Sequence, residues 1–255
     1  MSIMNLLGGI DSESATNRRG AIARGGQLAA AAVPVGLAAF ARRGFAASAS
    51  AAAPTIVEVL NFALTLEYLE ARYYILGVDS GVIPGRDSRI FTTIRDHEIA
   101  HRDFLIGVIR SLSATPVPEP TFDFTAGGAF APFANYDTFK LLAQAFEDTG
   151  VRAYKGQFPN LQSNDTVLTA AATIHSVEGR HAAEVRRLRG EKGWIPFEDP
   201  LAPAAIHAVY DGEGNLVQLG INVGAFEGAE AGTEAFDEPL TMAEVLAIAS
   251  PFIVG

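Results

Sequence analysis

The chain of 255 residues contains no cysteine. This absence excludes disulfides, zinc–thiolate sites, iron–sulfur clusters and cysteine nucleophiles, so any metal ion would have to be held by His, Asp and Glu side chains. Positive charge is also scarce. The formal net charge is −10, which argues against nucleic acid or an anionic membrane surface as a partner. With 49% hydrophobic and 19% charged residues, the composition is that of a globular protein.

The first fifty residues differ from the rest, because they carry five Arg against one Asp and one Glu. A polar start ends at Arg18 and Arg19, an Ala-rich apolar run covers residues 27–41, and small residues follow at 46–51. This order is typical of a secretory signal, and adjacent arginines favour the twin-arginine route. We therefore predict a leader at residues 1–51 and export to the periplasm or cell envelope. The alternative is an N-terminal helix that stays attached. We expect no transmembrane span in the mature protein, since the apolar run is shorter than the roughly 20 residues that a span needs.

From Pro54 to about residue 190, apolar residues recur at steps of three and four, which places them on one face of a helix. The pattern predicts four helices, with Pro84-Gly85 separating the first two. The predicted N-caps of the second, third and fourth helices are Asp87 or Ser88, Asn135, and Ser163 or Asn164. Residues 113–134 form a long connection between two short ones. One such crossover suits a four-helix bundle.

Charged side chains occupy the middle of these apolar faces, where core residues belong. They are Glu67, Glu98, His101, Glu147, Glu178 and His181. Burying an unpaired carboxylate is very costly, and a shared cation would compensate for that cost. Glu and His three residues apart project from the same helix face, so each Glu-x-x-His pair can chelate, and Glu67 and Glu147 would complete or bridge the set. Two alternatives stay open: a solvent-facing charged stripe, or charges that pair with each other and bind no metal.

The two halves of this region repeat each other. The interval from Glu67 to Glu98 equals that from Glu147 to Glu178, and a His follows at the same offset in each half. Aligning the halves also matches Arg72 with Arg152, Tyr74 with Tyr154 and Ile94 with Ile174. Each half is therefore predicted to form one helical hairpin. Pairing of the two hairpins about a pseudo-twofold axis would bring both sets of ligands to one place.

Three further residues lie close to the predicted ligands. Glu70, one turn after Glu67, is a candidate extra ligand or a replacement for Glu67, although Gly150 holds the matching place in the second half. Tyr74 and Tyr154 point inward and are candidates for hydrogen bonds to ligands or for redox steps, with core aromatics as the alternative. We expect no metal role for residues on other faces or outside the bundle, namely Arg72, Arg152, His97, His175 and His207.

One Glu on each of two helices and a Glu-x-x-His on each of the other two resembles the ferritin-like di-iron carboxylate superfamily. Together with the leader, residues 66–70 (Leu-Glu-Tyr-Leu-Glu) and 236–240 (Phe-Asp-Glu-Pro-Leu) are similar to exported bacterial ferritin-like domain proteins. The resemblance implies an all-α, ferritin-like four-helix bundle at residues 54–190 that binds two metal ions. In this arrangement the terminal ligands would be Glu98, His101, Glu178 and His181, and the bridges Glu67 and Glu147.

Residues 191–255 do not continue the bundle pattern and form a C-terminal extension. We expect the extension to pack on the bundle or to form a contact in a homo-oligomer, and we expect no chemistry from it. Its predicted elements are two strands, Ala205–Tyr210 and Leu216–Ile221, in a hairpin around residues 211–215, a loop at residues 220–232, and a short helix at 241–249 that Thr241 and Glu244 cap.

Carboxylates combined with imidazoles suit iron or manganese. The resemblance implies a redox reaction of this dimetal centre with dioxygen or peroxide, of the peroxidase, catalase or ferroxidase type. Two alternatives come from other classes of function. One is iron handling by a ferroxidase without turnover of another substrate, and the other is a structural or interaction protein of the cell envelope that retains the fold.

Overall fold

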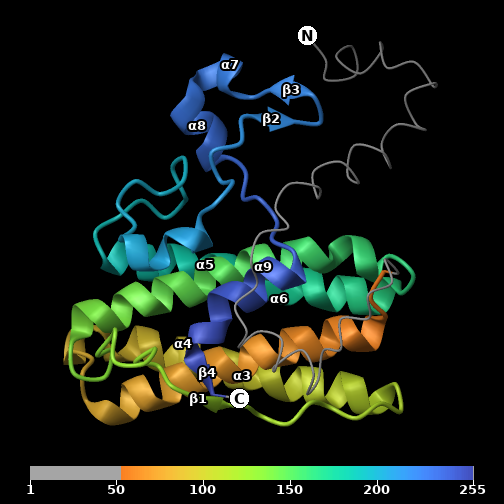
Figure 1. Cartoon of the computed structure of the whole chain (residues 1–255), viewed down its shortest axis with the longest axis vertical. Coiled ribbons are helices and arrows are strands. Elements are labelled where there is room, and N and C mark those ends of the chain that lie inside the picture. Colours follow the sequence, from red (N-terminus) through yellow and green to blue (C-terminus); the bar gives the residue numbers. More distant parts are fainter. Residues whose placement is uncertain (1–52, 255) are drawn as a thin grey trace. The chain divides into compact units, whose positions relative to one another are not determined.

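The computed structural model describes residues 53–254, so the predicted leader lies outside the described residues. The four long helices are α3 (Ile56–Ser80), α4 (Gly85–Ser111), α5 (Tyr136–Leu161) and α6 (Asp165–Leu188). Helix α3 packs along α4 and α5 along α6, and α3 also packs against α5 (Figure 1). The predicted all-α bundle is confirmed. Within residues 53–254, no helix combines the length and the apolar character needed to cross a membrane.

Side-chain caps fix where three of these helices begin. Asn135 Oδ1 accepts a hydrogen bond from the backbone N–H of Thr138 at 2.9 Å, and Asn164 Oδ1 accepts one from Val167 at 3.1 Å. Both caps were predicted from the sequence. Helix α3 begins with a capping box that we had not predicted, in which Thr55 and Glu58 each bond to the backbone N–H of the other.

The predicted N-cap of α4 is wrong by three to four residues. The helix begins at Gly85, directly after Pro84, and Asp87 lies in its first turn. The fixed φ of proline suits a helix start, and its missing N–H removes one donor that would need a partner. Asp87 is therefore free for another contact, and its carboxylate accepts a hydrogen bond from the Tyr136 hydroxyl at 2.7 Å.

The long connection between α4 and α5 is held by the C-terminal end of the described chain. It contains strand β1 (Thr121–Phe122), which pairs antiparallel with β4 (Ile253–Val254). Directly beyond this ladder, the Asp123 N–H donates a hydrogen bond to the Phe252 carbonyl at 2.9 Å. The crossover thus has partners from a segment remote in sequence.

The extension differs from its predicted layout. Residues 205–210, expected to be a strand, lie in and just after the 3-10 helix η3 (Ala204–Val209), which begins after Pro203. The hairpin is shorter and comes later in the sequence, and short helices α7 and α8 occupy the predicted loop. The remaining elements are β2 (Val217–Gln218), β3 (Ile221–Asn222), α7 (Gly224–Glu227), α8 (Ala229–Glu234), α9 (Met242–Ala249) and η4 (Ser250–Phe252). Helix α9 and its Thr241–Glu244 capping box are as predicted.

The strand prediction at residues 205–210 failed for an identifiable reason. Apolar side chains at Ile206 and Val209 are three residues apart, which is the repeat of a 3-10 helix, and both are buried. The preceding Pro203 fixes the backbone at the point where this turn begins. The apolar residues of this segment therefore follow the three-residue repeat of a 3-10 helix and not the two-residue repeat of a strand.

Buried arginines attach the extension to α5 and α6. Arg152 on α5 is 1% exposed, forms an ion pair with Glu213 at 2.7 Å, and donates hydrogen bonds to the carbonyls of Val209, Asp211 and Glu238. Arg186 on α6, also 1% exposed, lies 2.9 Å from both Asp148 and Asp199. Buried charges need partners of this kind, so removing one member of either network would be destabilising.

Gly156 on α5 offers a direct test of this attachment. A Cβ atom there would lie 1.9 Å from the Leu240 carbonyl oxygen, so the extension lies against bare helix backbone. We expect Gly156→Ala to lower the free energy of unfolding by about 1–3 kcal/mol. The control is Gly107→Ala on α4, where a Cβ would meet nothing within 4 Å. This substitution should raise the free energy of unfolding by about 0.5–1 kcal/mol. Urea unfolding measures both, and equal effects would contradict the packing described.

Candidate metal centre

The structure brings all six predicted ligands together in the middle of the bundle. Glu67 comes from α3, Glu147 from α5, and the two Glu-x-x-His pairs from α4 and α6. They fall into two overlapping groups, in each of which one ligand atom per residue lies within 4.8 Å of the others. The first group is Glu67, Glu98, His101 and Glu178, and the second is Glu98, Glu147, Glu178 and His181.

This grouping favours a different division of roles from the expected one. Glu98 and Glu178 belong to both groups, whereas Glu67 and Glu147 each belong to one. Only a carboxylate shared by both groups could contact two ions, so in a dimetal site Glu67 and Glu147 would be the terminal ligands. Spacing along a helix shows which face a side chain occupies, but not how far it reaches across to the other helices.

Each histidine faces three carboxylates. The Nδ1 atom of His101 is 3.0 Å from Glu178 Oε1, 3.3 Å from Glu98 Oε2 and 3.5 Å from Glu67 Oε2. The Nδ1 atom of His181 is 2.7 Å from Glu98 Oε1, 3.4 Å from Glu147 Oε2 and 3.8 Å from Glu178 Oε2. The charged atoms thus converge on a space between the helices instead of pairing one to one.

Burial shows that these groups need a further partner. All four glutamates are 0% exposed and His181 is 5% exposed. Among the described residues, several of their atoms lack a hydrogen bond of suitable geometry: Glu67 Oε2, Glu98 Oε1, Glu147 Oε2, both Glu178 oxygens and His181 Nδ1. His181 Nδ1 and Glu98 Oε1 are 2.7 Å apart but lack hydrogen-bond geometry. Unsatisfied oxygen and imidazole atoms that converge in this way fit iron or manganese.

In the metal-free protein, burial and the neighbouring charges favour the protonated forms of several of these side chains. Burial, reinforced by the charges of Glu178 and Glu98, raises the pKa of Glu67 to about 8. Burial likewise raises the pKa of Glu147. For His101 burial acts in the opposite direction, but the nearby carboxylates of Glu178, Glu67 and Glu98 raise its pKa to about 12. The pKa of His181 is raised in the same way, above all by Glu147.

Two tyrosines each form a hydrogen bond to a glutamate of the other helical hairpin. The Tyr74 hydroxyl, on α3, donates a hydrogen bond to Glu147 Oε1 on α5 at 2.5 Å, and the Tyr154 hydroxyl, on α5, donates one to Glu67 Oε1 on α3. Each tyrosine is buried, at 0% and 6% exposed. Each therefore fixes the carboxylate of the opposite half and leaves its second oxygen to the cluster.

The structure leaves Glu70 outside both groups. Its side chain is 3% exposed, and a Cβ atom at Gly150 would lie 3.1 Å from its Oε1 atom. Burial, together with the charges of Glu178 and Glu98, raises the pKa of Glu70 well above its ordinary value. Gly150 therefore departs from the internal repeat and leaves room for this carboxyl group, while the role of Glu70 as an extra ligand stays a prediction.

His97 is a neighbour of the centre that the sequence did not reveal. Its Nδ1 atom lies 2.9 Å from Nε2 of His181, and the two rings stack with centroids 5.2 Å apart. Because His97 directly precedes Glu98, the helical pattern turns it away from the ligand face, and only the packing of α4 against α6 shows the contact. His175 and His207 are members of neither group.

A four-helix bundle with carboxylates and histidines gathered on its facing helices defines a protein of the ferritin-like class. Comparison with family models matches the ferritin-like domain to residues 55–191, more than half of the chain. The chain therefore belongs to the ferritin-like domain family, as its resemblance had indicated. A search of the curated proteins finds no match to it.

The raised pKa values predict how stability depends on pH. Glu67 shifts from 4.5 to about 8 and His101 from 6.5 to about 12, so between pH 5 and 8 the folded metal-free protein binds more protons than the unfolded chain. Its free energy of unfolding should then fall as pH rises, by at most about 1.4 kcal/mol per pH unit for each extra proton. Thermal melts from pH 5 to 8, with and without Mn²⁺, measure this. Equal slopes in both series would contradict it, because bound metal displaces these protons.

The contact of His97 gives a second prediction. We expect His97→Ala to weaken Mn²⁺ binding by about 10–100-fold, because His181 loses the partner that orients its ring. The matched control is His207→Ala, an exposed histidine in η3, which should leave binding unchanged. Competition with a fluorescent chelator measures both affinities. An unchanged affinity in His97→Ala would show that this contact does not affect metal binding.

Proposed function

We propose that the protein is an exported dimetal protein that binds two iron or manganese ions and carries out redox chemistry with dioxygen or peroxide. The observation that carries this proposal is the pair of overlapping groups in which four fully buried glutamates and two histidines converge from four helices. Membership of the ferritin-like domain family supports the fold on which such a site is built. Export rests on the composition of residues 1–51.

In this proposal the six side chains would hold the two ions. Glu67 and His101 would hold one ion, Glu147 and His181 the other, and Glu98 and Glu178 would lie between them. Two bound ions that each change between the divalent and trivalent state would supply two electrons, enough to reduce dioxygen to hydrogen peroxide or hydrogen peroxide to water.

The protein's own residues would control protons and geometry. Metal binding requires Glu67 and the histidines to give up the protons they hold in the metal-free state, since a ligand must be deprotonated. Tyr74 and Tyr154 would keep Glu147 and Glu67 in position through their hydroxyl groups. Because the surrounding side chains are buried, the centre would react in an environment with little water.

The main alternative is a bundle whose charges neutralise one another, as in a structural protein of the envelope. It is favoured by the short distances from His101 to Glu178 and from His181 to Glu98, 3.0 and 2.7 Å, which a metal-free ion-pair cluster would also have. Ferroxidase or other iron handling would use the same site and would differ from an enzyme only in lacking a second substrate.

Metal content separates these functions. We expect mass spectrometry of untagged protein to find about two iron or manganese ions per chain, and Glu98→Gln/Glu178→Gln to lose them because both bridges become neutral amides. The matched control is Glu184→Gln, an exposed position on α6, which should keep the metal. A wild-type protein that stays empty after anaerobic addition of Fe²⁺ and Mn²⁺ would rule out the dimetal function and favour the structural one.

A further inference from the structure

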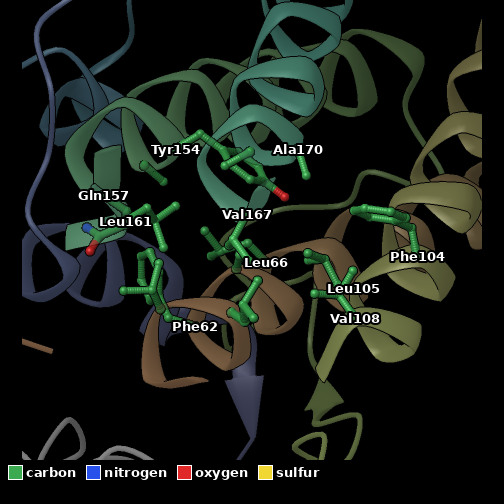
Figure 2. Close-up of a pocket in the computed structure, with 15 residues that line it drawn as sticks. Phe62, Leu66, Phe104, Leu105, Val108, Tyr154, Gln157, Leu161, Val167 and Ala170 are labelled. Atoms are coloured by element: carbon green, nitrogen blue, oxygen red, sulfur yellow. The ribbon is translucent and has the colours of Figure 1, made fainter. Parts of the chain in front are cut away.

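A small cavity lies inside the bundle, between the four long helices (Figure 2). All four long helices contribute to its wall, through residues 59–66, 104–108, 153–161 and 167–171. These segments mark the end of the bundle where α3 and α6 begin and where α4 and α5 end. Along each helix, the wall comes within about two turns of a predicted ligand.

The wall of the cavity exposes carbon atoms only. Leu66, Leu105 and Val167 come from three different helices and meet there (Figure 2). Of the polar residues in the wall, Tyr154 uses its hydroxyl to donate to Glu67, and Gln157 accepts a hydrogen bond from Asn160 at 2.9 Å. A guest in this space would therefore find dispersion contacts and no hydrogen bonds.

The size of the cavity limits what it can hold. Its volume is about 20 Å³, room for about one or two guests of the size of water, and apolar cavities of this kind stay dry and take up apolar gases. An extended organic substrate would not fit. Hydrogen peroxide would fit, but it would lose its hydrogen bonds to water without replacement, which is costly. Dioxygen has the required size and has no such bonds to lose.

The wall of the cavity includes a half-exposed residue and residues next to the cluster. Phe104 on α4 belongs to its wall and is 45% exposed, so this side of the cavity lies close to the surface. At the inner end, Tyr154 lines the cavity and also hydrogen-bonds to Glu67, and Leu66 in the wall directly precedes Glu67. A guest would thus contact a tyrosine that hydrogen-bonds to a predicted metal ligand.

We infer that this cavity is the route by which dioxygen reaches the dimetal centre, and that dioxygen rather than peroxide is its oxidant. The inference rests on the proposed function, because it assigns a substrate to the same site. The apolar wall concentrates dioxygen next to Glu67 and Tyr154 and holds polar oxidants back. Hydrogen peroxide would have to approach the cluster by another way.

The test fills the cavity and follows two probes. Ala171→Leu places three additional carbon atoms in the wall, while Ala172→Leu makes the same change at the neighbouring exposed position on α6. In metal-free protein, xenon monitored by ¹²⁹Xe NMR should bind to the wild type and to Ala172→Leu, but not to Ala171→Leu. After anaerobic loading with Fe²⁺, Ala171→Leu should react with dioxygen at least about tenfold more slowly in stopped flow, with an unchanged rate for hydrogen peroxide.

The outcomes separate this inference from the proposed function. Wild-type protein that binds Fe²⁺ but takes up no xenon would overturn the route alone, as would equal slowing of both oxidants or unchanged rates in Ala171→Leu. Wild-type protein that takes up xenon but binds no metal would overturn the function, and the route with it. Should Ala171→Leu fail to fold, Val167→Ala replaces it. That variant enlarges the cavity and should bind xenon more tightly without slowing the reaction with dioxygen.

Discussion

The structure depends on the cost of burying four carboxylates in one helical bundle. Glu67, Glu98, Glu147 and Glu178 are all 0% exposed, and such groups cannot remain charged in an apolar interior without compensation. In the metal-free protein, compensation comes from protons on Glu67 and on the two histidines. The same atoms, once deprotonated, would be able to hold metal ions. The bundle therefore fixes a set of buried groups whose charge either protons or a bound cation would neutralise.

Much of the fold could be predicted because its signals are local. Apolar residues at helical spacing defined the four helices, and Asn135 and Asn164 marked the starts of two of them. The ligands were equally visible, since a charged residue in the middle of an apolar face stands out against its neighbours. The start of α4 and the 3-10 helix at Ala204–Val209 were misread, because in both cases a proline sets the backbone and the apolar pattern does not.

Features that depend on distances between helices could not be read from the sequence. The contact of the exposed His97 with His181 becomes visible only when α6 is placed beside α4. The division of bridging and terminal roles likewise depends on how far each glutamate reaches across the bundle. From the sequence we expected only that Arg152 has no metal role, and its burial follows from the extension, whose carbonyl groups accept hydrogen bonds from its guanidinium. Spacing predicts faces of helices, and packing decides which faces meet.

The pairing of β1 with β4 has a consequence for the order in which the protein folds. The hairpins α3–α4 and α5–α6 are built from neighbouring residues and can form early, whereas the ladder joins residues 121–122 to residues 253–254 and must wait until the ribosome has delivered both. Until then the crossover presents an unpaired strand edge, which is a site for association with other chains. The final residues of the described chain thus act as a late closure that protects an already assembled bundle.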